Sequence, residues 1–200
     1  LGAIGISLQT EGRPCEGGCL LAVNHVSWLD IMAVHAVAPA ARFVSKADVK
    51  RWPLVSRLVD AAGTLYLERE RKRDALRVVH VMAESLRRGE TVAIFPEGTT
   101  GTGHDLLPFH ANLLKAAVAT GVPVQPVALR YSDASHAVSE AVEFVGNTTM
   151  LQSLWRTARG ECVVVRLVFL PPRPAAGAER RELAQALRAD IAEALALASR

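Results

Sequence analysis

The run TVAIF at residues 91–95 constrains the fold more than any other feature of the sequence. Four consecutive apolar residues end this run, with no polar residue between them. A strand with one solvated face alternates apolar and polar residues, whereas a strand buried on both faces of a parallel sheet is continuously apolar. A second run, CVVVRLVFL at 162–170, is also predicted to be a buried strand and is stopped by Pro171 and Pro172.

Predicted strands and helices alternate along the rest of the chain. Further strands are predicted at 18–23, 42–46, 63–69 and 122–131, and helices at 27–37, 53–59, 74–88, 111–120 and 178–199. This alternation predicts an α/β fold in which helices flank a largely parallel central sheet. A length of 200 residues suits one domain over residues 1–200, with a C-terminal strand and helix at 161–199.

The charge balance excludes one class of partner. The formal net charge is +3, with no long basic tail and no interleaved aromatic pattern. Nucleic acid is therefore not an expected partner, whereas lipid head groups or phosphates are compatible with the mild positive charge. No apolar stretch is long enough to span a bilayer. Because the sequence begins at Leu1, an upstream membrane anchor stays open.

The cysteines point to a reducing compartment. Cys15, Cys19 and Cys162 are odd in number and poorly spaced for a disulfide framework. Cys15, Cys19 and His25 are residue types that bind metals, but no second pair of potential metal ligands follows them in the sequence. No metal site is predicted.

The segment NHVSWLD at 24–30 directly follows the apolar run at 19–23. Residues five apart on one helix point in different directions, so His25 and Asp30 can meet only if the chain turns between them. We expect His25 at the strand end and Asp30 in the first turn of the next helix. Ser27 is expected to be the N-cap of that helix, because no G-x-S-x-G elbow marks it as a nucleophile.

Other polar residues also follow predicted strands. Arg69 ends GTLYLER, and Glu97 follows the run at 91–95. Parallel strands place their carboxyl ends on one edge, so His25, Arg69 and Glu97 are expected to converge. Taken singly, His25 is more often a structural histidine, Arg69 a solvated charge and Glu97 a turn cap. Only their joint occurrence favours a catalytic site.

Four blocks in order resemble the glycerolipid acyltransferases typified by lysophosphatidic acid acyltransferase, the 1-acyl-sn-glycerol-3-phosphate acyltransferase type. The blocks are NHVSWLD, an N-H-x4-D motif; GTLYLER, with a glycine and an aromatic before an arginine; FPEGT; and the proline-bearing strand VPVQPVAL. Together they span 19–131 with the spacing of that family. The sequence departs from many relatives at His110 and Ala111, where those carry a lysine-glycine pair.

The chemistry expected of these residues is acyl transfer to a hydroxyl. His25 would be the general base, and Asp30 would orient its ring and stabilise the imidazolium. Arg69 suits a phosphate, and Glu97 would orient glycerol hydroxyls or fix the loop. The resemblance implies that Gly98 and Thr99 complete this acceptor site. It also implies acyl-CoA or acyl carrier protein as donor, lysophosphatidic acid as acceptor, and no cofactor.

Two alternatives stay open: another lysolipid acceptor such as lyso-ornithine lipid, and a non-catalytic lipid-binding domain. Lipid substrates imply contact with a membrane surface, at the cytoplasmic face of a membrane that is expected to be bacterial. The candidate contacts are Arg71, Lys72, Arg73 and Trp52. Alternatively, Trp52 belongs to the core and the basic run is simply solvated.

Overall fold

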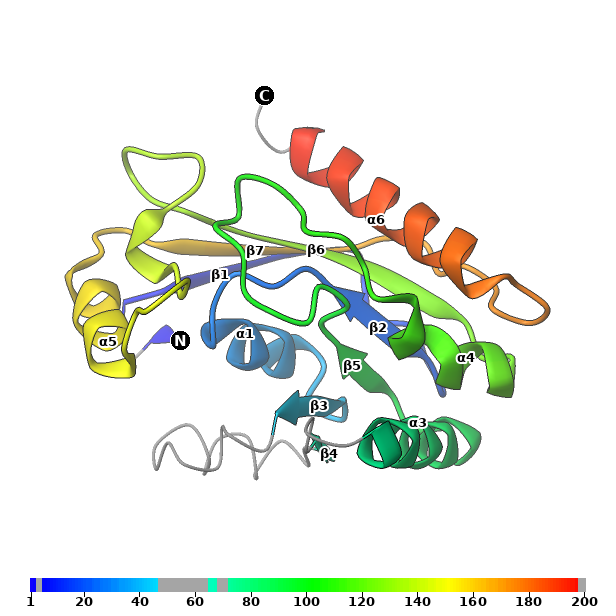
Figure 1. Ribbon diagram of the computed structural model, residues 1–200. Helices are drawn as coiled ribbons and strands as arrows, with labels where there is room; N and C mark the ends of the chain where they lie inside the picture. The colour runs from blue at the N-terminus through cyan, green and yellow to red at the C-terminus, as the bar shows by residue number, and fades with distance from the viewer. Residues whose placement is uncertain (3–4, 47–64, 68–71, 198–200) are drawn as a thin grey trace.

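The computed structural model describes residues 1–2, 5–46, 65–67 and 72–197 of the chain. A seven-stranded sheet runs through it in the order β1-β7-β6-β2-β5-β3-β4 (Figure 1). The strands are β1 Ser7–Glu11, β2 Leu20–Val23, β3 Arg42–Lys46, β4 Leu65–Leu67, β5 Val92–Ile94, β6 Val124–Ser132 and β7 Val164–Phe169. Neighbouring strands are parallel except β6 and β7, which are antiparallel. The predicted α/β fold with a largely parallel sheet is confirmed.

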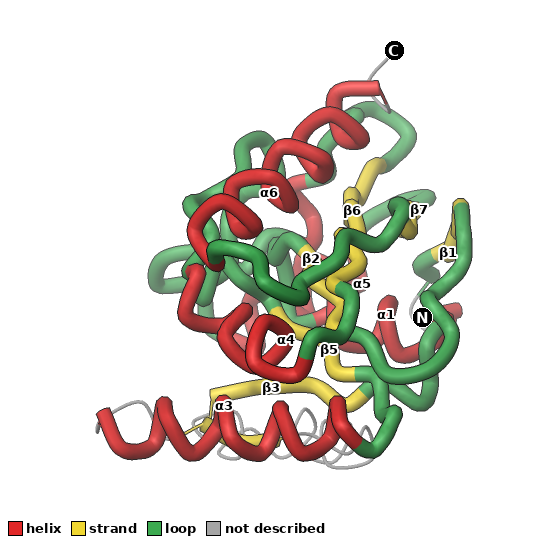
Figure 2. Tube along the Cα trace, turned by 90° about the vertical axis from the view of Figure 1, so that its right-hand side faces the viewer, coloured by secondary structure: helices red, strands yellow, loops and turns green. Residues whose placement is uncertain are grey.

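Helices cover both faces of the sheet, with α4 and α6 on one side and α1 on the other (Figure 2). The helices are α1 Leu29–Val37, α3 Lys72–Arg87, α4 Lys115–Thr120, α5 Met150–Arg159 and α6 Arg180–Leu197, with 3₁₀ turns η3 Ala111–Leu114 and η4 Glu140–Val142. Strand β2 shows why helices are needed on both faces of the sheet. Leu21 and Val23 belong to the core cluster that includes residues of α1, whereas Leu20 and Ala22 belong to the cluster with residues of α3, α4 and α6.

The sequence prediction differs from the structure in several elements. Strand β1 and helix α5 were not predicted, and the helix predicted at 111–120 begins as the 3₁₀ turn η3. Strand β7 is fully buried only at alternate residues, so its second face is less covered than a continuous apolar run predicts. The helix predicted at 53–59 lies outside the described residues.

The expectation of reduced thiols is wrong for two of the three cysteines. Cys15 and Cys19 form a disulfide, and their Cα atoms are 6.6 Å apart. Ahead of β2, the amide side chain of Gln125 accepts from the Cys15 N–H and donates to the Arg13 carbonyl, which ties this part of the loop to β6. Cys162 is free and exposed.

No group of three or more His, Cys, Asp or Glu side chains lies together as possible metal ligands among the described residues. Within the same residues, no helix has both the length and the apolar character needed to cross a membrane.

Candidate active site

Asn24 fixes the point at which the chain leaves the sheet. Its buried side-chain amide donates to the Leu129 carbonyl at 2.9 Å and accepts from the Leu129 N–H at 2.7 Å. These two hydrogen bonds extend the pairing of β2 with β6 by one residue through a side chain. His25, the next residue, is therefore held at the carboxyl edge of the sheet.

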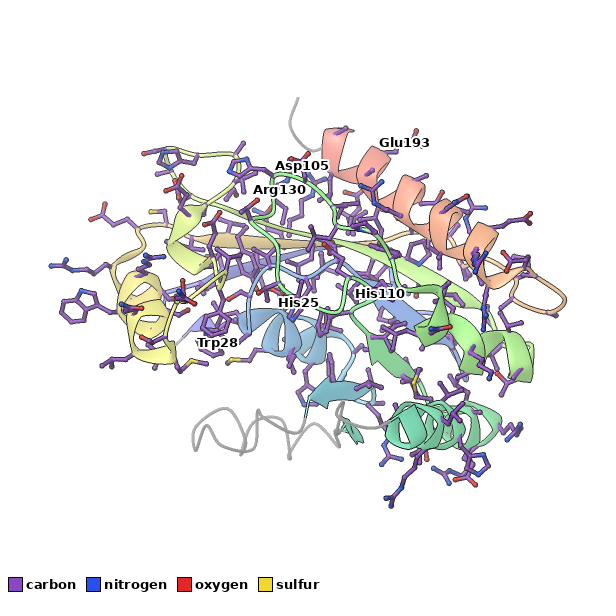
Figure 3. All side chains as sticks on the ribbon, in the orientation of Figure 1. His25, Trp28, Asp105, His110, Arg130 and Glu193 are labelled. Atoms are coloured by element: carbon purple, nitrogen blue, oxygen red, sulfur yellow. A yellow bond between two sulfur atoms is a disulfide. The ribbon has the colours of Figure 1, made fainter. Side chains whose placement is uncertain are left out.

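The His25 and Asp30 side chains meet across the turn that follows. His25 Nδ1 lies 2.7 Å from Asp30 Oδ2, with Asp30 in the first turn of α1. The Asp30 side chain is fully buried, whereas the His25 side chain is 18% exposed. The predicted strand–turn–helix geometry is confirmed. Figure 3 shows His25 beside α1, near the middle of the sheet.

The predicted Ser27 N-cap is wrong. Trp28 occupies the N-cap position of α1 and makes no side-chain cap hydrogen bond. Asp30 Oδ2 instead accepts from the N–H groups of Val26 and Ser27, at 2.7 and 2.9 Å. The carboxylate therefore binds the amides of the turn that precedes α1. Within the described structure, the Ser27 hydroxyl is buried and makes no hydrogen bond.

Tyr131 is a site residue that sequence reasoning missed. Its hydroxyl donates to Asp30 Oδ1 at 2.9 Å from the end of β6, a strand parallel to β2. Complete burial, then the charge of Asp30, and then this hydrogen bond raise the pKa of Tyr131 well above its usual value. Tyr131 therefore stays protonated and remains a donor. The four hydrogen bonds to Asp30 compensate the burial of its charge.

Phe95 sets the plane of the His25 ring. The two rings are stacked with centroids 4.1 Å apart and planes inclined by 17°. Phe95 follows β5, so the strand beside β2 supplies this packing. Because Nδ1 is engaged by Asp30, Nε2 is the ring nitrogen that can exchange a proton with a substrate.

Glu97 contacts backbone rather than side chains. Its Oε1 accepts from the His25 N–H at 2.8 Å, and its Oε2 accepts from the Leu107 N–H at 2.9 Å. Burial raises the pKa of the Glu97 carboxyl above its usual value of 4.5, and these two hydrogen bonds only partly offset the increase. Of the two roles predicted for Glu97, these contacts are those of a loop anchor.

Gly98 and Thr99 form the turn after Glu97. Gly98 has a φ of 70°, which favours glycine, and its N–H donates to the Phe95 carbonyl at 3.0 Å. The Thr99 side chain is exposed beside this turn. The chain then returns to the site, where the Gly101 N–H donates to the His25 carbonyl at 2.8 Å.

Arg188 of α6 holds the far end of this loop, a contact with no signal in the sequence. Its guanidinium donates to the carbonyls of Leu106 and Leu107, at 2.5 and 3.1 Å. The Leu107 N–H is the same group that binds Glu97. Helix α6 therefore supports the loop beneath which His25 lies.

The side chains predicted to contact the acceptor and the membrane near the second block lie outside the described residues. Arg69, Arg71 and Trp52 lie outside the described residues. Lys72 and Arg73 open α3, but their side chains also lie outside them. The convergence of His25 and Glu97 is confirmed, and that of Arg69 stays a prediction.

Comparisons with known proteins agree with the geometry. A family model described as "Acyltransferase" matches residues 6–130. The chain is 39% identical over 183 residues to a lyso-ornithine lipid O-acyltransferase of Pseudomonas aeruginosa, covering 92% of this chain and 70% of that protein. It is 35% identical over 201 residues to a 1-acyl-sn-glycerol-3-phosphate acyltransferase of Neisseria meningitidis, covering 96% and 78%.

A solved structure supports the fold. The crystal structure of the 1-acyl-sn-glycerophosphate (LPA) acyltransferase PlsC from Thermotoga maritima matches with a TM-score of 0.67 at 22% identity. The match covers 94% of this chain and 70% of that one. Both chains therefore share one fold over nearly the whole of the present sequence.

Proposed function

Because this chain belongs to the acyltransferase family and is an O-acyltransferase of the lysolipid type, we propose that it moves a fatty acyl group from acyl-CoA or acyl carrier protein to the free hydroxyl of lysophosphatidic acid. The observation that carries this proposal is the 2.7 Å contact between His25 Nδ1 and the buried Asp30 carboxylate. A histidine held in this way is suited to remove a proton from an alcohol.

In the proposed reaction the acceptor hydroxyl is the nucleophile. Its oxygen attacks the thioester carbonyl while Nε2 of His25 takes its proton, and Asp30 stabilises the resulting imidazolium. The tetrahedral intermediate then collapses, the carbon–sulfur bond breaks, and the imidazolium returns the proton to the leaving thiolate. The products are the acylated lipid and a free thiol, so the step needs no cofactor.

Acceptor recognition is proposed to involve Arg69 and the turn that follows β5. Arg69 would bind the phosphate through two of its guanidinium N–H groups. The exposed side chain of Thr99 supports a place for it, with Gly98, in the acceptor site. Glu97 would hold this turn in shape through its backbone contacts.

A second acceptor, lyso-ornithine lipid, is favoured by the relative at 39% identity. Lyso-ornithine lipid lacks the terminal phosphate, so the two acceptors make different demands on Arg69. We propose in either case that the enzyme works at the cytoplasmic face of a bacterial membrane, peripherally or through an anchor. The expected basic contacts Arg71, Lys72 and Arg73 remain part of this proposal.

Side-by-side assays with both acceptors test the proposal, following free thiol release from acyl-CoA and, separately, from acyl carrier protein. With lysophosphatidic acid, Arg69→Ala should raise the acceptor KM far more than the donor KM, and Arg69→Lys should rescue poorly. An unchanged acceptor KM, together with faster turnover of lyso-ornithine lipid, would favour the second acceptor. Binding of lysolipid without thiol release would indicate a non-catalytic domain.

A further inference from the structure

Helix α5 packs Met150 and Leu154 against the core but turns Leu151 and Trp155 outward. Leu151 is 78% exposed and Trp155, one turn later, is 62% exposed. Ser153 and Thr157 lie on the opposite side of the helix and are buried. The exposed positions of an ordinary surface helix are polar, so two large apolar side chains at such positions need a reason.

Hydrogen bonds fix this orientation of α5. Trp28 Nε1 donates to the Ser153 hydroxyl at 3.0 Å, and the Thr157 hydroxyl donates to the Ala141 carbonyl at 3.4 Å. A capping box between Thr149 and Gln152 forms the start of the helix. Because the buried polar groups have partners, the fold holds Leu151 and Trp155 outward as a stable ridge.

The ridge carries positive charge. The Arg159 guanidinium lies over the Trp155 ring, 4.8 Å from its centroid, and the Arg156 side chain is exposed. No acidic residue occurs within α5. Acidic groups do lie nearby. Burial and then the charge of Glu140 raise the pKa of Glu143, the charge of Arg156 partly opposes this rise, and exposed Glu161 follows the helix. Tryptophan, leucine and arginine together suit the head-group region of an anionic bilayer.

The ridge also lies at the edge of the sheet that carries the site. Strand β7, which follows α5, begins at Val164, and Val164 pairs with Ser132 at the carboxyl end of β6. Trp28, which binds Ser153, belongs to the same turn as His25. Figure 3 shows Trp28 between α5 and His25 in that view, and Figure 1 shows α5 at the opposite end of the molecule from α4.

We propose that Leu151 and Trp155 insert into the surface of an anionic bilayer, with Arg156 and Arg159 at the head groups. The proposal rests on the proposed function, since a lysolipid acceptor lies in such a bilayer. A second copy of the chain is a poorer occupant. A helix of 10 residues is about 15 Å long, and one face of it supplies a small part of the roughly 800 Å² per partner of a stable interface.

Vesicle flotation with phosphatidylethanolamine and phosphatidylglycerol tests the ridge. A Leu151→Ser, Trp155→Ala double variant should bind at least about tenfold more weakly, because both side chains lose apolar area that would leave water. The control is Ala192→Ser, which introduces the same hydroxyl at an exposed position of α6, a helix that is not among the proposed membrane contacts. The control should bind like the unchanged protein. Unchanged binding of the double variant, or an equal loss in the control, would overturn the assignment.

Two further measurements distinguish the docking surface from the proposed function and from an interface between two copies of the chain. Acyl transfer to a short-chain lysolipid dispersed below its micelle concentration should be the same in the double variant and in the unchanged protein, because no bilayer is involved. Absence of transfer in both proteins, with vesicle binding still lost only in the double variant, would reject the proposed function and leave the docking surface standing. Light scattering that shows a dimer only in the unchanged protein would make the ridge a self-interface and overturn the proposal.

Discussion

The turn after β2 and the turn after β5 each place one buried carboxylate at the same edge of the sheet, but they surround it differently. Asp30 receives the His25 ring, the Tyr131 hydroxyl and two backbone N–H groups. Among the described residues, Glu97 accepts from two backbone N–H groups, those of His25 and Leu107. The first carboxylate therefore acts on a reactive side chain, and the second acts on the shape of the chain around it.

The comparison shows that burial alone does not define what a carboxylate does. Burial dominates the environment of Glu97 and raises its pKa, because two partly buried hydrogen bonds do not replace water fully. Asp30 has four donors for its two oxygens, and one of them is the ring that takes part in the proposed chemistry. The partners of each carboxylate thus predict different consequences of substitution.

The largest expected effect in this comparison is that of replacing Asp30. Asp30→Asn removes the charge that stabilises the imidazolium and disturbs the tautomer of His25, so kcat should fall by about a hundredfold or more. Thiol release at saturating donor and acceptor measures it, and circular dichroism controls for folding. A folded Asp30→Asn protein with kcat close to the unchanged value would remove the distinction between the two carboxylates.

Glu97→Ala should affect stability first. The substitution leaves the His25 and Leu107 N–H groups without their acceptor, and the free energy of unfolding should fall by about 2 kcal/mol. Urea unfolding measures the loss. If stability is unchanged while turnover collapses as it does for Asp30→Asn, Glu97 takes part in the chemistry and is not a loop anchor.

The raised pKa of Glu97 predicts a dependence on pH. A carboxyl whose pKa is higher in the folded than in the unfolded state gives its full stabilisation below the ordinary value of 4.5 and loses it as the pH rises through the folded value. Relative to Glu97→Gln, which does not titrate, the unchanged protein should be more stable at pH 4 than at pH 7. Urea unfolding of both proteins at the two pH values gives this difference. A difference that stays constant or grows toward pH 7 contradicts the burial argument.

The smallest expected effect is that of Tyr131→Phe. This change removes one of the four donors to Asp30 and keeps the ring, so kcat should fall only several-fold, consistent with about 1 kcal/mol for one hydrogen bond. Steady-state kinetics beside Asp30→Asn give the ratio of the two effects. A loss as large as that of Asp30→Asn would make Tyr131 an equal partner in orienting the site.

The parts of the site that are local in sequence were predictable. His25 and Asp30 lie in one short motif, and the rule that parallel strands end at one edge brought Glu97 beside them. Tyr131 was not predictable, because it is 101 residues from Asp30 in sequence and a hydrogen bond between two strands leaves no spacing signal. Ser27 was assigned as the N-cap, but Trp28 occupies that position, since a motif does not show at which residue the helix begins.

The elements that sequence reasoning missed, β1 and α5, lack a clear division into an apolar face and a polar face. Strand β1 is mostly exposed, so its sequence SLQTE has no apolar face to detect. Helix α5 buries Ser153 and Thr157 beside Met150 and Leu154 and exposes Leu151 and Trp155, so neither of its faces is uniformly apolar or polar. The Cys15–Cys19 disulfide depends on a loop held by Gln125, a residue 110 positions from Cys15 in sequence.

Turnover of a His25→Ala protein tests the central claim most directly, that His25 held by Asp30 is the base for acyl transfer. The assay follows both free thiol and acylated lipid, with His80→Ala as the control because His80 is a 70% exposed histidine on α3. His25→Ala should fold, and its kcat should be at least about a hundredfold lower, while His80→Ala keeps the unchanged rate. Turnover of folded His25→Ala near that of the unchanged protein would contradict the account.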